Sequence, residues 1–318
     1  MTRLRIAVFG TPAFAVPTLD ALLASEHDVV GVVTQPDRPR GRGQQVSESP
    51  VKERARLAGV PVLQPTRLGD EAFLAAFREW RADLGVVAAY GRLLPQALLD
   101  IPPRGLINVH ASLLPAWRGA SPIQRAVLDG DRVAGVTIMR VVLALDAGAM
   151  LGRVELPIAP DDTAGTLETR LAVAGAHLLR DVVDRMGQGE TVAEEPQDDS
   201  KATLAPKIEK QDGLINWTRP AAELDRHVRG MQPWPGAFTF VDGQRVVIRE
   251  ATVDARAAGA AGPGDLIDRD GDAAVFACGD GTALRVRQVQ PAGKRVMTAR
   301  EWLQGRRSPL PIVAGPHA

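Results

Sequence analysis

Leu4-Arg-Ile-Ala-Val-Phe9, followed directly by Gly10-Thr-Pro12, is the stretch that decides the fold class of this chain. It is a short apolar run that ends at residues typical of a turn, and this combination predicts a buried strand. Pro17–Leu23 predicts a helix, because proline is tolerated in a first turn, and Val29–Val33 predicts a second strand. A strand, a helix and a strand in this order predict a parallel sheet covered by helices.

The same alternation of apolar runs and helical patterns continues as far as Met186. Further runs with the length and composition of buried strands are Val60–Leu63, Leu84–Ala88, Leu106–His110 and Val136–Val142. Further helical patterns are Asp70–Trp80, Pro122–Leu128 and Thr163–Met186. This alternation predicts a doubly wound α/β domain, with helices on both faces of a mainly parallel sheet.

The pattern changes near Gly187. Gly189–Ala205 is polar and acidic, as expected of a linker. After an amphipathic helix over Ala221–Met231, short strand-like runs follow at Ala237–Val241, Arg245–Arg249, Ala273–Ala277 and Ala283–Arg287. We therefore predict a first domain over residues 1–188, a linker over 189–206, and a small β-barrel or sandwich over 207–318.

Composition limits the class of protein. A chain of 318 residues with 45% hydrophobic residues suits two globular domains. Cys278 is the only cysteine, which excludes an intramolecular disulfide and a cysteine-rich zinc site, and the five histidines are not paired as metal ligands. The first apolar run is too short for a signal peptide or a membrane span, so we expect a cytoplasmic protein without membrane contact. The sequence does not define an oligomeric state, and a monomer is the simplest expectation.

The charge is balanced overall but unevenly distributed. There are 38 basic and 38 acidic residues, yet from Arg285 to Arg307 the only acid is Glu301. A second basic cluster, Arg38, Arg40 and Arg42, lies in a loop rich in proline and glycine. Each cluster is either a solvated face or a surface that contacts phosphates, and composition does not choose between the two.

Candidate catalytic residues lie at strand ends, where open α/β sheets place their sites. Asn108 and His110 are two apart on one strand and therefore project to the same face. The alternative is a strand-end asparagine in a turn beside a satisfied core histidine. Asp146 follows the run Val136–Val142, where an acid is more often a turn-former, and spacing alone does not bring it to His110.

The segment Ser112-Leu113-Leu114-Pro115 leaves the same strand and offers backbone polar groups with apolar surface, which suits a flat heterocyclic ligand. The chain lacks a dinucleotide fingerprint, a phosphate loop and a Gly-x-Ser-x-Gly elbow. Without an evident nucleophile of its own, the set of Asn, His and Asp suits transfer between two bound substrates, in which the protein stabilises an oxyanion and handles a proton.

Motifs in a fixed order over nearly the whole chain resemble the methionyl-tRNA formyltransferase family. They are Gly10–Pro12, Thr34–Gly43, Ser49–Lys52, Ala89–Gly91, Ile107–His110, Ser112–Pro115, Trp117–Gly119, Pro122–Arg125, Gly135–Met139, Pro233–Gly236 and Gln290–Lys294. The resemblance implies a Rossmann-like formyltransferase domain, a linker and a C-terminal barrel of OB-like form.

The resemblance also implies the roles of the site residues. Asn108, His110 and Asp146 are the implied catalytic residues, and Ser112, Leu113, Leu114 and Pro115 the implied contacts of tetrahydrofolate. The implied tRNA contacts are Arg42, Lys294 and Arg295. The implied reaction moves the formyl group of 10-formyltetrahydrofolate, without a metal, to the amine of initiator methionyl-tRNA. In this scheme Asn108 and protonated His110 stabilise the oxyanion, and Asp146 holds His110 charged.

The chain departs from the family's usual residues near these motifs. The departures are Ala13, Gln44, Gln45, Ala111, Arg140, Val142, Ala144, Ala147 and Ala149. They affect the expected rate and substrate binding more than the reaction class. An amino-sugar nucleotide N-formyltransferase remains an alternative, because Asp146-Ala-Gly-Ala149 is closer to that branch of the superfamily. An RNA-binding protein with a decayed site and a formyl-folate hydrolase are the others.

Overall fold

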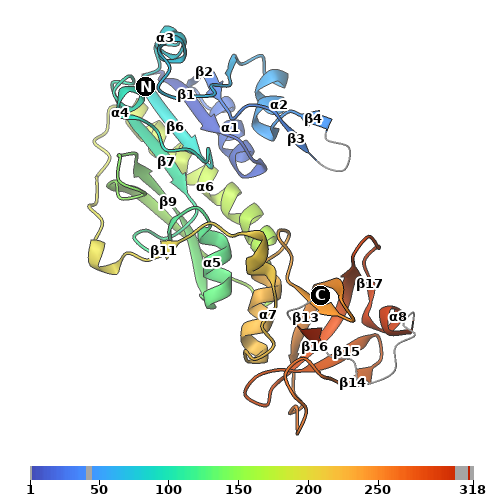
Figure 1. The fold of residues 1–318 in the computed structure, drawn as a ribbon. Helices are drawn as coiled ribbons and strands as arrows, with labels where there is room; N and C mark the ends of the chain where they lie inside the picture. The colour runs from blue at the N-terminus through green and yellow to red at the C-terminus, as the bar shows by residue number, and fades with distance from the viewer. Residues whose placement is uncertain (1, 41–44, 305–313, 316–318) are drawn as a thin grey trace. The chain divides into compact units, whose positions relative to one another are not determined.

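The computed structural model describes residues 2–40, 45–304 and 314–315 (Figure 1). The chain divides into two compact units. The first unit comprises Met1–Pro122, Val133–Pro157 and Glu168–Pro206, and the second comprises Ile123–Arg132, Ile158–Leu167 and Lys207–Ala318. The last and longest segment of the second unit thus begins directly after the segment predicted as a linker.

The first unit is built on a mixed sheet in the order β10-β9-β7-β6-β1-β2-β5. The strands are β1 (Arg5–Gly10), β2 (Asp28–Val33), β5 (Val62–Leu63), β6 (Leu84–Ala88), β7 (Leu106–His110), β9 (Val133–Arg140) and β10 (Met150–Pro157). The pairs from β5 to β7 are parallel, whereas β9 is antiparallel to both β7 and β10. Since all five residues of the central strand β6 are buried, helices must cover both faces of the sheet. The predicted α/β class is confirmed.

Four α-helices outside the C-terminal segment begin and end close to the predicted positions: α1 (Val16–Leu23), α3 (Glu71–Glu79), α5 (Pro122–Asp129) and α6 (Ala164–Gly187). Two more, α2 (Pro50–Leu57) and α4 (Gln96–Leu99), were not predicted. Helix α2, which the sequence analysis did not predict, begins after Ser49, whose hydroxyl accepts the backbone N–H of Lys52 at 3.1 Å. This is a helix cap, and Pro50 at the first helical position suits it.

Helix α6 determines which face of β7 is free for a site. A Cβ atom at Gly175 would lie 3.0 Å from side-chain carbons of Val109 and Val136, so the helix backbone approaches β7 and β9 closely at this glycine. Val109 alternates with Asn108 and His110 along β7, and α6 therefore covers the opposite face from these two polar residues.

The segment predicted as a linker is ordered against the first unit. β11 (Leu204–Ala205) pairs in parallel with β8 (Arg118–Gly119), and a further bridge joins Glu195 to Met150. In each case the backbone of the segment lies beside residues that flank the candidate site. The segment therefore forms part of the first unit as far as Pro206.

The second unit contains α7 (Ala221–Gly230), α8 (Ala299–Gln304) and a curled antiparallel sheet in the order β14-β15-β16-β13-β12-β18 (Figure 1). Its strands are β12 (Phe238–Val241), β13 (Gln244–Asp254), β14 (Leu266–Asp270), β15 (Ala273–Ala277), β16 (Ala283–Pro291), β17 (Met297–Thr298), which pairs with β16, and β18 (Ala314–Gly315). Trp217 and Phe276 pack in its core with ring centroids 5.2 Å apart. The predicted β-rich second part is confirmed.

Two further observations bear on the predictions. β3 (Arg38–Arg40) and β4 (Gln45–Ser47) form an antiparallel pair, and Arg42 lies outside the described residues. No helix of the described part of the chain is long and apolar enough to cross a membrane.

Candidate active site

Strand β7 places Asn108 and His110 on the face away from α6. The His110 side chain is buried, and its Nε2 lies 3.1 Å from the carbonyl oxygen of Trp117. Because a carbonyl oxygen only accepts, Nε2 is the donor in this contact. The other ring nitrogen, Nδ1, lies 3.7 Å from Oδ2 of Asp146, within ion-pair range but too far for a good hydrogen bond.

Asp146 reaches His110 through a loop that folds back. His110 pairs with Thr137 and Ile107 with Arg140, so the antiparallel strand β9 ends beside the beginning of β7. The residues after β9 then return toward His110. Asp146 thus follows the end of a strand as predicted, but that end lies beside the beginning of β7, opposite to the end that carries His110. The loop, and not the strand, therefore brings the carboxylate to the imidazole.

The Asp146 loop has a demanding backbone. Asp146 has a φ of +46°, in the left-handed region, and its Oδ2 accepts the backbone N–H of Gly119 at 2.8 Å. A Cβ at Gly148 would lie 1.9 Å from the carbonyl oxygen of Arg140, so only glycine fits there. The surrounding contacts must therefore hold this loop in place.

The Asn108 side chain is open to a ligand. Asn108 is only half-buried. Within the ranges that the structure describes, its amide makes no hydrogen bond. An amide carries donors and an acceptor, and beside an ordered imidazole it is available to a polar group of a substrate. The structure brings Asn108, His110 and Asp146 into one site, as the sequence analysis predicted only through the family resemblance.

The segment Ser112–Pro115 is fixed by its own side chains. The Ser112 hydroxyl donates to the carbonyl of Ala116 at 2.6 Å, and Leu114 is buried against Met139 and Met150. Leu113 and Pro115 are partly exposed. A folate contact along this segment would therefore use Leu113, Pro115 and backbone groups, and the predicted set of four remains a prediction.

Thr137 is a structural residue of the site that the sequence analysis did not single out. Its buried hydroxyl donates to the carbonyl of Ser112 at 2.7 Å and accepts the backbone N–H of Leu114 at 3.1 Å. It thereby ties the segment to β9. The signal was a threonine inside an apolar strand, which is too common to identify a role. The contributions of Trp117 and Gly119 come from backbone groups and carry no side-chain signal.

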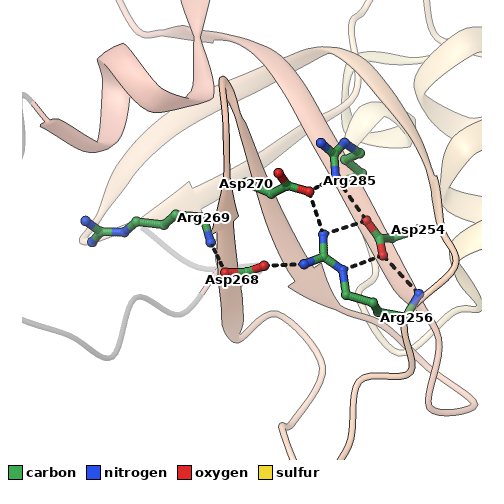
Figure 2. Close-up of polar contacts among 6 residues, drawn as sticks. All are labelled: Asp254, Arg256, Asp268, Arg269, Asp270 and Arg285. Atoms are coloured by element: carbon green, nitrogen blue, oxygen red, sulfur yellow. Dashed lines mark hydrogen bonds and ion pairs between the residues drawn. The ribbon is translucent and has the colours of Figure 1, made fainter.

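Acids from neighbouring strands neutralise part of the basic segment Arg285–Arg307. Figure 2 shows Arg256 in contact with Asp254, Asp268 and Asp270, and Arg285 in contact with Asp254 and Asp270. Arg295 lies 3.1 Å from Glu301. Among the residues that are described, the exposed Lys294 has no ion-pair partner. Glu301 is thus the only acid in the sequence of the segment but not in its surroundings, and Lys294 and Arg300 are exposed cations of the segment without an ion-pair partner among the described residues.

No group of three or more His, Cys, Asp or Glu side chains in the described ranges is arranged to hold a metal ion.

Comparison with known proteins places this site in a family. Residues 4–183 match the family model described as formyl transferase, and residues 207–307 match that of the formyl transferase C-terminal domain. A methionyl-tRNA formyltransferase of Bacillus licheniformis is 46% identical over 95% of this chain and 95% of its own length. That of Paramagnetospirillum magneticum is 45% identical over 98% of this chain and all of its own. The chain belongs to the methionyl-tRNA formyltransferase family.

As a member of that family the chain is an enzyme of one-carbon formyl transfer. Two solved structures share its fold. HypX from Aquifex aeolicus in complex with tetrahydrofolic acid has a TM-score of 0.66 at 16% identity and covers 95% of this formyltransferase and 47% of its own chain. WlaRD, a sugar 3N-formyl transferase, has a TM-score of 0.67 at 16% identity, and the match covers 93% of this formyltransferase and 100% of the WlaRD chain. At this identity both support the fold alone.

Proposed function

We propose that this enzyme transfers the formyl group of 10-formyltetrahydrofolate to the free amine of initiator methionyl-tRNA. The proposal rests on the open Asn108 amide beside His110, whose ring is held between a backbone carbonyl and the Asp146 carboxylate. It agrees with relatives of the same length that carry this name. The alternative of an amino-sugar acceptor has only fold-level support.

The residues of the site suit the charge that develops in this reaction. The folate supplies a formyl carbon that the amine attacks, so negative charge develops on the formyl oxygen. We assign the Asn108 amide as a donor to that oxygen, since donors fixed before the reaction stabilise such charge most effectively. His110 is the second donor, once its Nε2–H exchanges the Trp117 carbonyl for the formyl oxygen. The Asp146 carboxylate, 3.7 Å from Nδ1, is placed to balance positive charge on the imidazole.

The fixed geometry of the ring supports this assignment. The contact between Nε2 and the Trp117 carbonyl and the neighbouring carboxylate define how the imidazole is oriented before substrate binds. Partly exposed Leu113 and Pro115 offer an apolar edge on the segment that leaves β7. Together with the unpartnered Asn108 amide, these groups suit a folate whose reactive carbon lies against polar donors.

The tRNA contacts are proposed on charge. Lys294 is exposed and has no acidic partner among the residues that the structure describes, and Arg295 is exposed beside Glu301. Arg42 lies in the sequence between β3 and β4, outside the described residues, and enters the proposal through the family motif alone. A flexible cation without a partner is free to contact a phosphate.

One assay tests the function. The enzyme is incubated with 10-formyltetrahydrofolate and one of three acceptors: charged initiator tRNA, an amino-sugar nucleotide or water. We expect formylation of methionyl-tRNA with the highest kcat/KM. Preferential formylation of the sugar, or release of formate without an acceptor, would overturn the proposal in favour of the corresponding alternative.

A further inference from the structure

The amide of Gln197 bridges two parts of the active site. Its Nε2 donates to the carbonyl oxygens of Asp146 and Gly148, at 2.8 and 2.7 Å. Its Oε1 accepts from Nε and an Nη of Arg118, at 3.0 and 2.8 Å. A glutamine amide has two N–H donors and one oxygen with two acceptor sites, so all of its hydrogen-bonding capacity is used here.

Arg118 fixes the orientation of that amide. Its side chain is only 11% exposed and also contacts Asp199 at 2.7 Å. An arginine only donates, so the amide oxygen must face it and the NH2 group must face the two carbonyls. A rotated amide would place its oxygen against two carbonyl oxygens and its N–H groups against a guanidinium. The arrangement is specific for glutamine.

The two carbonyls that Gln197 holds belong to the strained loop of the catalytic carboxylate. Asp146 has a left-handed backbone, and its carboxylate has a single hydrogen bond among the described residues, from the Gly119 N–H. Gly119 is in turn fixed by the pairing of β8 with β11. Residues 197–205 thus hold the Asp146 loop through its backbone carbonyls. They also hold Gly119, whose N–H donates to the Asp146 carboxylate.

We propose that Gln197, oriented by Arg118, is a positioning residue that sets the Asp146 carboxylate relative to His110. The inference rests on the proposed function and adds a role for a segment that the sequence analysis treated as a linker. Because Gln197 contacts backbone carbonyls rather than reacting atoms, it acts only through the position of Asp146.

The test compares Gln197→Leu and Gln197→Glu with the wild type. Leucine leaves both carbonyls without donors, and glutamate, nearly identical in shape, turns an oxygen toward them. We expect both variants to lower kcat for methionyl-tRNA by about tenfold to a hundredfold, the effect of a small misplacement in an active site. The KM for folate should stay within about twofold of the wild-type value, since no folate-contacting group changes. Gln188→Leu, at an exposed glutamine of the same chain region, is the matched control and should be unchanged.

A double-mutant cycle separates positioning from general structural support. In the Asp146→Asn background, Gln197→Leu should lower kcat by less than about twofold, because its effect passes through the missing carboxylate. Equal losses in both backgrounds would mean that Gln197 supports the fold in general and would overturn the inference. Normal kcat in Gln197→Leu and Gln197→Glu would also overturn it while leaving the proposed function in place.

A crystal structure of the Gln197→Leu variant gives a readout that is independent of activity. The Asp146 carboxylate is expected to move from its position beside Nδ1 of His110. An unmoved carboxylate would overturn the inference even if the wild type formylates methionyl-tRNA. A displaced carboxylate in an enzyme that does not formylate methionyl-tRNA would support the inference and reject the proposed function.

Discussion

Asp146 in the first unit and Asp254 in the second are both aspartates beside a basic side chain, but their hydrogen bonds differ. Asp254 Oδ1 accepts from the backbone N–H and Nε of Arg256, at 2.9 and 2.8 Å, and Oδ2 accepts from an Nη of the same arginine at 3.0 Å. Arg285 adds a contact at 3.5 Å. These arginines hold the pKa of Asp254 well below its usual range. Asp146 accepts one hydrogen bond, from Gly119, and lies 3.7 Å from His110.

The difference in hydrogen bonding separates a structural carboxylate, Asp254, from Asp146, the carboxylate that we propose for the reaction. Asp254 is 6% exposed with its acceptor sites occupied, so it has no capacity left for a substrate or a proton. Asp146 keeps Oδ1 without a partner in the described part of the chain. A site that binds and releases groups needs acceptor atoms that are free to form hydrogen bonds, whereas a fold is stabilised when such atoms already have partners.

The largest expected effect is the loss of kcat when a proposed catalytic residue is removed. His110→Ala and Asn108→Ala should each lower kcat by about 10²–10³, the usual cost of losing one oxyanion donor. Folate affinity should change little in both variants, and thermal stability should change little in Asn108→Ala, because Asn108 has no hydrogen bond to lose among the described residues. Steady-state kinetics with methionyl-tRNA and folate titration check this. Normal turnover in either variant would remove that residue from the mechanism.

The next largest effect is on the stability of the second unit. Asp254→Asn should destabilise the second unit by about 1–2 kcal/mol, since Arg256 and Arg285 lose a buried carboxylate partner, while the cost is limited because Arg256, 41% exposed, is partly rehydrated. Urea unfolding at neutral pH measures this difference. Unchanged stability would show that the network in Figure 2 contributes nothing to the fold.

The same variant makes a prediction about pH. The pKa of Asp254 is depressed in the folded protein, so its contribution is complete above the unfolded value of about 3.9. It decreases as the pH falls from that value toward the folded pKa, when the unfolded state takes up the proton first. The stability gap between wild type and Asp254→Asn should therefore be constant from pH 7 to about pH 5 and narrow below about pH 4. A gap that is independent of pH would contradict the assigned pKa shift.

The sequence predicted the elements of the fold where burial leaves a periodic signal. Leu84–Ala88 and Leu106–His110 are strands with the predicted bounds, because buried strands of parallel sheets are continuous apolar runs. β10 was not predicted, because from Gly152 onward its residues alternate between exposed and half-buried at the edge of the sheet. Its polar and apolar residues mix as they do in loops.

The site was predictable only in part, for a physical reason. Asn108 and His110 share a strand, so their common face follows from the period of two. Asp146 meets them through a returning loop, and Gln197 through side-chain hydrogen bonds across 51 residues of chain. Neither approach leaves a pattern in local sequence, and the acids around Arg285 come from neighbouring strands in the same way.

A smaller effect distinguishes paired from unpaired cations in the basic segment. Lys294→Gln should lower the slope of log affinity for tRNA against log salt by about 0.9, the value for one phosphate contact to a duplex. Arg295→Gln should lower it less, because Glu301 already neutralises part of that charge. Binding measured at several salt concentrations checks this. A dissociation constant that is insensitive to salt, or to neutralising both residues, would contradict tRNA binding by this segment.

The smallest expected effect is at Cys278. Burial raises the pKa of its thiol to about 12, and the side chain lies in the core of the second unit. Because the thiolate is the reactive form, N-ethylmaleimide at neutral pH should not label the native enzyme or change its kcat. Cys278 is the only cysteine, so labelling followed by mass spectrometry reports opening of the second unit alone.

Labelling of Cys278 also reports on the stability that the Asp254 network provides. If the Asp254 network stabilises the second unit by about 1–2 kcal/mol, Asp254→Asn raises the open population about 5- to 30-fold, and labelling of Cys278 should accelerate by the same factor. His110→Ala should leave the labelling rate at the wild-type value, because the reactive site contributes little to the fold of the second unit. Rapid labelling of the wild type would show that Cys278 is accessible without opening. Equal acceleration by Asp254→Asn and His110→Ala would mean that the Asp254 network has no special role in the stability of the second unit, contrary to what its hydrogen bonds indicate.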